Sequence, residues 1–309
     1  APRSLVVSFS AGQRSSLDPR GRVIRLSSRR YVALRALAPL LERRGDVTHA
    51  FGAVDSWHLL RSVGRRPTLL TVALGGTPLP RLYGHVAMFA VQAPGLRQLL
   101  LEAGVPPERI TLVYPGIDLG IFRDAPPPGG RFTVLFASTP ANPAEFDDRG
   151  IPLIVDVARR CFDIEFVLLW RQWGALRAAE QALQALRLPP NVVVRHEDVA
   201  DMAEEYARVH AVICCYANNF GKACPNAVME ALACGRPALV TSTVGLAGLV
   251  HDDGAGVVVP RDPDAVRAGL EALRSGYDQY RHRARPAAEA RFDLARAAAA
   301  YKALYEKLA

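Results

Sequence analysis

The sequence has little lysine and few cysteines, and it has no long apolar run. Only Lys222, Lys302 and Lys307 occur among 309 residues, so arginine supplies almost all the positive charge. The five cysteines are an odd number without a paired CxxC spacing, which argues against a disulfide framework or a zinc site. No apolar stretch approaches the roughly 18 residues that a membrane-spanning helix needs. We therefore expect no zinc site and no transmembrane helix.

The cysteines and the first residues also bear on where the protein works. Cysteines without a pairing pattern are typical of a reducing compartment. Residues 1–7 show no signal-peptide layout. We expect a cytoplasmic protein, or one held peripherally at the inner surface of a membrane.

The positive charge is concentrated in the first part of the chain. Residues 1–128 carry 17 Arg against 8 Asp and Glu, whereas residues 129–309 carry 21 Lys and Arg against 22 Asp and Glu. Such asymmetry predicts an anionic partner, and we expect an anionic or membrane-associated acceptor and no nucleic acid. Four arginines at the ends of an amphipathic helix are the best candidates to face it: Arg29, Arg30, Arg43 and Arg44. A solvated arginine-rich surface is the alternative.

Strand-like and helix-like patterns alternate along the chain. The expected strands are residues 4–10, 22–26, 46–51, 67–73, 86–91, 110–114, 131–138, 164–170, 191–195, 210–217, 237–242 and 256–260. The expected helices are residues 31–44, 56–63, 95–103, 150–160, 176–186, 201–208, 225–234 and 262–276. Such alternation is typical of parallel sheets covered by helices on both faces. The fold class is therefore α/β, with two doubly wound domains.

A proline- and glycine-rich stretch at residues 125–130 is the clearest linker. It separates an N-terminal domain of residues 1–126 from a second domain of residues 127–276, and residues 277–309 form C-terminal helices. Ligands of open α/β sheets bind outside the carboxyl ends of the strands. We therefore expect a ligand site in a cleft where the two domains face each other.

One segment of the second domain has the layout of an anion site. Residues 216–242 read YANNFGKACPNAVMEALACGRPALVTS, which predicts a loop, a helix and a buried strand. Pro225 suits the first helical position, and Gly235 suits the left-handed position after the helix. Helix N-termini bind anions, and Lys222 stands just before this one. Glu230, one turn into the helix, could accept hydrogen bonds from ribose hydroxyls, so the segment indicates a nucleotide. An ordinary crossover helix with a solvated Glu230 is the alternative.

Several segments, in order along the chain, resemble one family of enzymes. Residues 225–237, PNAVMEALACGRP, resemble the nucleotide-sugar signature of retaining glycosyltransferases of family 4, which have the GT-B fold. Three more segments are similar to passages of that family: residues 46–49 (DVTH), 110–122 (ITLVYPGIDLGIF) and 248–260. The resemblance implies two Rossmann-like domains facing a cleft, with the N-terminal domain shortened.

The resemblance also implies an activity and a donor site. The activity is transfer of a sugar from a UDP- or GDP-linked donor to an acceptor, with retention of anomeric configuration and without a metal or another cofactor. Glu230 would hold the ribose, the amides of Asn226 and Ala227 would face the diphosphate, and Arg149 would bind phosphate. We expect the catalytic groups to be Lys222, Arg149 and Glu230. Further donor contacts are expected at Arg195, His196, Cys224 and Pro225.

The acceptor side is expected at four positions of the matching segments, namely Gly75, Gly76, His49 and Gly116. His49 itself is interpreted as a satisfied residue of a buried strand rather than as a base. The acidic pairs Asp147-Asp148 and Asp252-Asp253 lie in expected loops, where carboxylates are solvated. We therefore expect no metal site at either pair.

Three positions depart from the family pattern. Lys222 stands where the family often has Glu, Leu74 where it has a His that contacts donor or acceptor, and Pro143 where some members have Arg. Two alternatives therefore stay open. One is a sugar-nucleotide epimerase of the same architecture, against which the lack of an evident His–Glu acid–base set argues. The other is a catalytically degenerate GT-B protein that binds nucleotide or glycan without turnover.

Overall fold

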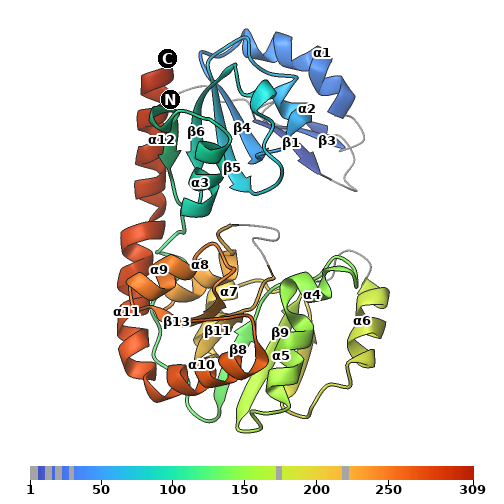
Figure 1. The fold of residues 1–309 in the computed structure, drawn as a ribbon, viewed down its shortest axis with the longest axis vertical. Coiled ribbons are helices and arrows are strands. Elements are labelled where there is room, and N and C mark those ends of the chain that lie inside the picture. Colours follow the sequence, from blue (N-terminus) through green and yellow to red (C-terminus); the bar gives the residue numbers. More distant parts are fainter. Residues whose placement is uncertain (1–5, 11–15, 18–22, 28–30, 172–175, 218–222) are drawn as a thin grey trace. The chain divides into compact units, whose positions relative to one another are not determined.

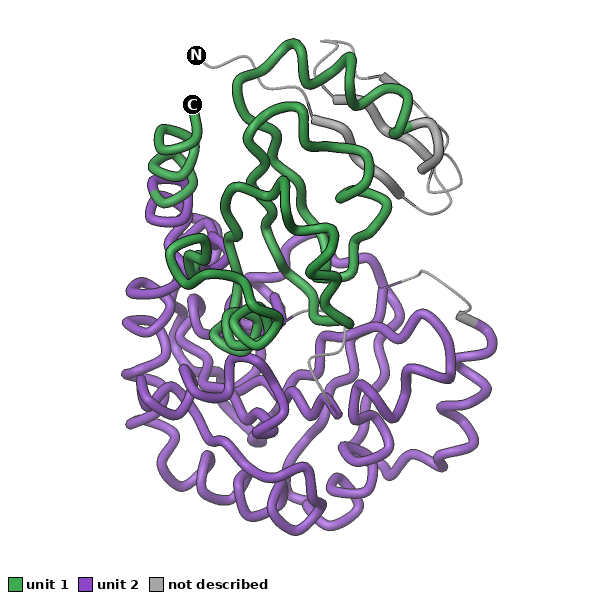
Figure 2. Tube along the Cα trace, turned by 45° about the horizontal axis from the view of Figure 1, so that its top comes forward, with its two compact units in different colours: residues 1–113, 300–309 green, residues 114–299 purple. Residues whose placement is uncertain are grey.

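The computed structural model describes residues 6–10, 16–17, 23–27, 31–171, 176–217 and 223–309. The chain forms two compact units, Ala1–Val113 with Ala300–Ala309 and Tyr114–Ala299 (Figure 2). It passes from one unit to the other after Val113 and again inside the last helix. The domain boundaries near residues 126 and 276 stay predictions. No helix among the described residues is both long and apolar enough to cross a bilayer.

The first unit contains a four-stranded parallel sheet and a separate three-stranded sheet. The four-stranded sheet has the order β4-β5-β6-β7, with β4 (Thr48–Ala53), β5 (Thr68–Leu74), β6 (Val86–Val91) and β7 (Ile110–Leu112). Its helices are α1 (Tyr31–Glu42), α2 (Trp57–Leu60) and α3 (Pro94–Glu102). In the other sheet β1 (Val6–Ser10) pairs in parallel with β3 (Val23–Ser27), and β3 pairs antiparallel with β2 (Ser16–Leu17). Strand β2 lies in a stretch for which the sequence predicted neither a strand nor a helix.

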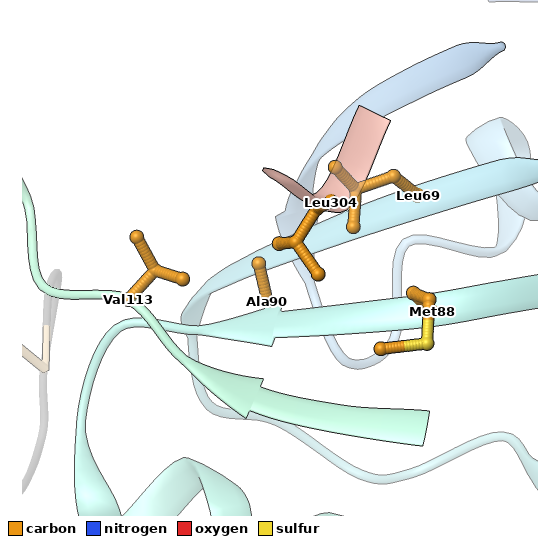
Figure 3. Close-up of a cluster of buried hydrophobic side chains, with 5 residues drawn as sticks. All are labelled: Leu69, Met88, Ala90, Val113 and Leu304. Atoms are coloured by element: carbon orange, nitrogen blue, oxygen red, sulfur yellow. The ribbon is translucent and has the colours of Figure 1, made fainter. Parts of the chain in front are cut away.

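The end of the chain packs into the first unit. Leu304 of α12 (Leu294–Leu308) is buried in one cluster with Leu69, Met88, Ala90 and Val113 (Figure 3). These partners come from β5, β6 and the residue that follows β7. Burial of each large apolar side chain stabilises a fold by about 1.5–3 kcal/mol. The last turns of α12 are therefore part of the hydrophobic core of the first unit.

The second unit is built on a six-stranded parallel sheet (Figure 1). Its order is β10-β9-β8-β11-β12-β13, with β8 (Phe132–Phe136), β9 (Ile164–Trp170), β10 (Val192–His196), β11 (Ala211–Cys214), β12 (Ala238–Thr241) and β13 (Gly256–Val259). The helices are α4 (Glu145–Arg149), α5 (Ile151–Ala158), α6 (Leu176–Ala185), α7 (Met202–Ala207), α8 (Asn226–Ala233), α9 (Ala247–Asp252), α10 (Pro263–Ser275) and α11 (Tyr277–Phe292). Both large sheets are parallel, so the α/β prediction is confirmed.

Strand order in this sheet reverses at β8. The chain adds β9 and β10 on one side of β8 and then β11, β12 and β13 on the other. Connections from β8 and β11 therefore leave in opposite directions and open a crevice at the carboxyl ends of these two strands. Ligands of doubly wound sheets bind at such a switch point. The segments that follow β8 and β11 are consequently where a site is expected.

Local details differ from the sequence-based expectations in three places. Asp147 and Asp148 lie in α4, and Asp252 is the last residue of α9, so these acidic residues are helical rather than in loops. Pro225 precedes α8 as its extended N-cap residue, with φ −61° and ψ 123°, instead of occupying the first helical position. Helices α4 and α9 contain five and six residues, which is too short for helical periodicity to emerge from a sequence.

Candidate functional site

Helix α8 brings an N-terminus to the segment that follows β11. The N-cap residue, Pro225, makes no side-chain hydrogen bond to this end. The first amides of the helix point toward any anion that binds there. At the other end Gly235 has φ +70°, as the sequence predicted, and a Cβ on it would lie 2.0 Å from Oδ1 of Asp124. Nearly every apolar side chain of α8 is buried. The packing of these side chains therefore fixes the direction of the helix N-terminus.

Glu230 is held by the neighbouring helix α7. The hydroxyl group of Tyr206 donates a hydrogen bond of 2.8 Å to Oε2 of Glu230. Tyr206 is fully buried, and burial together with the charge of Glu230 raises its pKa well above the usual value. The phenol therefore remains protonated and continues to donate. It engages one carboxylate oxygen, and the sequence offered no signal for this partner beyond its position in an expected helix.

Arg149 lies at the carboxyl end of β8. Its Nε donates to Oε2 of Glu145 over 2.8 Å, and its Nη1 donates to Oγ of Ser138 over 2.5 Å. Tyr216, which follows β11, donates its hydroxyl hydrogen to the same Ser138 oxygen over 2.9 Å. The guanidinium is mostly buried, with 14% of the side chain exposed. The hydroxyl group of Ser138 thus links the segment after β8 to the segment after β11, and it orients Arg149.

Gly150 lets the start of α5 approach the end of β11 closely. Its φ is +76°, and a Cβ there would lie 2.1 Å from the carbonyl oxygen of Cys215. The amide of Ala217 also donates to the carbonyl oxygen of Asp148 over 2.8 Å. Only glycine fits this backbone conformation at this separation without strain. The Arg149-Gly150 pair is therefore anchored at the switch point by backbone contacts.

Arg195 and His196 end β10 in different surroundings. Nε of Arg195 donates to Glu197 over 2.6 Å, and Nη2 donates to Glu205 over 3.1 Å. These carboxylates, Glu205 first, raise the pKa of the Arg195 guanidinium. The ring of His196 packs edge-on against Trp170 at 5.3 Å and lines a pocket of about 270 Å³. The Arg195 side chain is thus engaged within the protein, and the donor roles of both residues stay predictions.

His49 on β4 is satisfied by two hydroxyl groups. Its Nε2 lies 2.7 Å from Oγ1 of Thr71, and its Nδ1 lies 2.6 Å from the hydroxyl of Tyr305 on α12. Burial lowers the pKa of His49 to about 4, so the ring is neutral at pH 7. A ring with both nitrogens occupied and this pKa is a poor base. Its interpretation as a satisfied residue agrees with these contacts.

The low pKa of His49 predicts a pH-dependent stability. Unfolded histidine has a pKa near 6.5, so only the unfolded state gains a proton as the pH falls from about 6.5 toward 4. The contribution of His49 to the free energy of unfolding is therefore fully present above about pH 6.5 and is lost as the pH falls toward 4. Between pH 7 and pH 5 the first unit should lose about 2 kcal/mol through this residue. Hydrogen exchange of β4 and β5 at both pH values measures the loss.

The matched variants for this pH dependence are His49→Asn and His251→Asn. Asparagine at position 49 keeps hydrogen-bonding groups but cannot titrate, so the stability difference between pH 7 and pH 5 should shrink by about 2 kcal/mol. The His251 side chain is 78% exposed, and its replacement should leave the pH dependence of β4 and β5 unchanged. An unaltered pH dependence in His49→Asn would contradict this explanation.

The predicted acceptor-side glycines have different surroundings. A Cβ at Gly75 would meet no atom within 4 Å, whereas Gly76 has φ +138° and closely approaches the carboxylate of Asp55. A Cβ at Gly116 would lie 2.8 Å from Cα of Leu294. Beside it, Ile117 forms a β-bridge with Asp293. Gly116 therefore has a structural use in the second unit, where it permits this contact with the start of α12.

Some predicted residues have no described role here. Lys222, Arg29 and Arg30 lie outside the described residues. Cys224 is buried, and Leu74 ends β5. Among the described residues no group of three or more His, Cys, Asp and Glu side chains could hold a metal ion. The expectations for Lys222 and for metal-independent chemistry stay predictions.

The chain is similar to known glycosyltransferases. Residues 150–275 match the model of the family described as glycosyl transferases group 1, and no curated protein matches the chain in sequence. A glycosyltransferase from Rickettsia africae ESF-5 is 13% identical with a TM-score of 0.77, covering 98% of this chain and 90% of its own. Sucrose-phosphate synthase from Thermosynechococcus elongatus is 16% identical with a TM-score of 0.78, covering 98% and 88%.

A third similar structure is that of Anabaena HepE in complex with UDP-glucose. It is 14% identical with a TM-score of 0.75, and the match covers 98% of this chain and 99% of that one. At these identities the likeness concerns the fold. The chain has the GT-B fold of these glycosyltransferases, as the sequence predicted.

Proposed function

We propose that the protein transfers a sugar from a UDP- or GDP-linked donor to an acceptor, with retention of anomeric configuration and without a metal. One observation carries the proposal. The segment that matches the glycosyltransferase family contains α8, whose N-terminus follows β11 at the switch point and whose Glu230 is fixed one turn into the helix by Tyr206. A helix N-terminus suits a diphosphate, and a fixed carboxylate suits ribose hydroxyls. UDP-glucose bound to the structurally similar Anabaena protein supports the donor class.

The chemistry of such a transfer needs stabilisation of the leaving group. When the bond between the anomeric carbon and the diphosphate breaks, the departing oxygen gains negative charge. Oriented amides of α8 and the Arg149 guanidinium would stabilise that charge because they are positioned before the reaction starts. Lys222 would add a second cation. The family resemblance alone supports retention of configuration.

Replacement of Glu230 tests the donor site. Glu230→Ala should weaken UDP binding by about 1–3 kcal/mol, the scale of hydrogen bonds to a charged group. Calorimetry with UDP and with 2′-deoxy-UDP sharpens the test. The wild-type protein should prefer UDP, and the variant should lose most of that preference because its ribose contact is gone.

Glu271→Ala is the matched control for this test. Glu271 lies on α10 with 51% of its side chain exposed, and it pairs with Arg267 on the same helix. Its loss should leave UDP affinity unchanged, because exposed pairs contribute little. If Glu230→Ala binds UDP and 2′-deoxy-UDP with the same affinities as the wild-type protein does, the proposed contact between Glu230 and the ribose is refuted.

Turnover separates the enzyme from a degenerate binder. Leu74 stands where the resembled family has a histidine, which favours the alternative of binding without transfer. Incubation with UDP- and GDP-linked sugars should release the nucleoside diphosphate, by transfer to an acceptor or slowly to water. Nucleotide binding without any donor cleavage, also with candidate acceptors present, would support the alternative instead.

A further inference from the structure

An open pocket in the first unit lies beyond the carboxyl ends of β4 and β5. Its volume is about 580 Å³, within the roughly 300–1,000 Å³ of small-molecule sites. Helix α2, which follows β4, supplies Trp57, and the residue after this helix is Arg61. The segment after β5 supplies residues 78–82. The carboxyl edge of a parallel sheet is where α/β proteins bind ligands. The position of the pocket therefore suits a substrate.

The lining of this pocket combines apolar side chains with two cations. Its residues are Trp57, Arg61, Pro78, Leu79, Pro80, Arg81 and Leu82. Trp57 is 43% exposed, so part of its side chain is open to a molecule in the pocket. The guanidinium carbon of Arg61 lies 5.5 Å from the centre of the Trp57 ring. This contact holds a positive charge directly beside an apolar surface.

The arginines between residues 31 and 113, all of which the structure describes, outnumber the acidic residues there. Residues 31–113 carry nine Arg against five Asp and Glu. Within the described part of the chain, Arg61 and Arg81 form no ion pair. The other arginines between residues 31 and 113 form none there either. In the second unit, by contrast, several arginines form ion pairs with carboxylates. The charge at the pocket is thus available to an external anion.

We propose that this pocket binds a lipid phosphate, the hydrocarbon chain lying against Trp57 and the leucines and the phosphate between Arg61 and Arg81. An apolar lining alone would accept any hydrocarbon, and two arginines alone would accept any anion. Both together select a molecule that has an anion at the end of a hydrocarbon chain. Guanidinium groups match phosphate oxygens through paired hydrogen bonds. That this lipid is the sugar acceptor rests on the proposed function, whereas its binding does not.

Dodecyl phosphate, kept below its micelle concentration, tests the proposal on the full chain. Calorimetry should give saturable binding. In protein labelled with 5-fluorotryptophan, the fluorine resonance that is missing from Trp57→Phe should shift on titration. Dodecyl maltoside and inorganic phosphate, each holding half of the required chemistry, should bind at least about tenfold more weakly, since each loses one set of contacts. Comparable binding of either one would overturn the proposal.

Paired arginine variants localise the binding. Arg61→Gln with Arg81→Gln should weaken dodecyl phosphate binding by about tenfold or more. The control, Arg35→Gln with Arg97→Gln, removes the same charge from exposed positions outside the pocket and should change affinity less than about twofold. Circular dichroism checks that both are folded. Equal weakening in both would mean non-specific attraction and would overturn the site. Nucleotide is absent throughout, so failure of the transferase proposal would not affect the result.

Discussion

Gly150→Ala should destabilise the second unit by about 2–5 kcal/mol. A left-handed backbone costs a residue with a Cβ about 1–2 kcal/mol. The added carbon would also lie 2.1 Å from the carbonyl oxygen of Cys215, so the backbone must shift at an overpacking cost of about 1–3 kcal/mol. The displaced segments follow β8 and β11. UDP affinity should therefore fall together with stability.

Gly104→Ala separates the two contributions. Gly104 has φ +81°, but a Cβ on it would meet no atom within 4 Å. Gly104→Ala should destabilise the first unit by only about 1–2 kcal/mol, the cost of a left-handed backbone for a residue with a Cβ. It should leave UDP affinity unchanged. Hydrogen exchange measures each unit separately, which matters because two units need not unfold together. Equal losses in both variants would show that the contact with Cys215 is unimportant.

Most strands and helices could be predicted from the sequence. Buried parallel strands are short apolar runs that are bounded by glycine, proline and polar residues. β6 and β9 occupy the predicted residues 86–91 and 164–170, and the alternation of strands and helices gave the α/β class. The separate sheet of β1, β2 and β3 could not be predicted in this way. Pairing between strands depends on contacts distant in sequence, and β2 has only two residues.

The sequence predicted only those residues of the candidate site that lie within one recognisable sequence motif. Glu230 follows from its place in a helix and in a family signature. Its partner Tyr206 is 24 residues away, and the partners Ser138 and Tyr216 are 78 residues apart. Nothing local in the sequence marks such pairs, because each residue is ordinary for its own strand or helix. The switch point itself becomes visible only once the strand order is known.

Arg236 is the residue whose loss we expect to cost most in the second unit. Its side chain is fully buried directly after α8. Nε donates to the carbonyl oxygen of Tyr206 over 2.8 Å, and the terminal nitrogens donate to those of Ala125, Pro126 and Ala207 over 2.7–3.3 Å. One guanidinium thus joins α8, α7 and the proline-rich segment after residue 124. Burial removes the guanidinium of Arg236 from water and thereby lowers its pKa. The carbonyl groups take the place of the lost water as hydrogen-bond acceptors.

Arg236→Leu should therefore destabilise the second unit by about 3–5 kcal/mol, because it leaves buried carbonyl groups without donors. The same change should weaken UDP binding, since the backbone of Tyr206 loses a contact while its hydroxyl positions Glu230. Arg267→Leu, on the surface of α10 with 41% of its side chain exposed, should cost less than about 1 kcal/mol and leave UDP affinity intact. Denaturant unfolding and calorimetry measure the two effects. Should Arg236→Leu be as stable as Arg267→Leu, the carbonyl contacts of Arg236 would not be what joins these three segments.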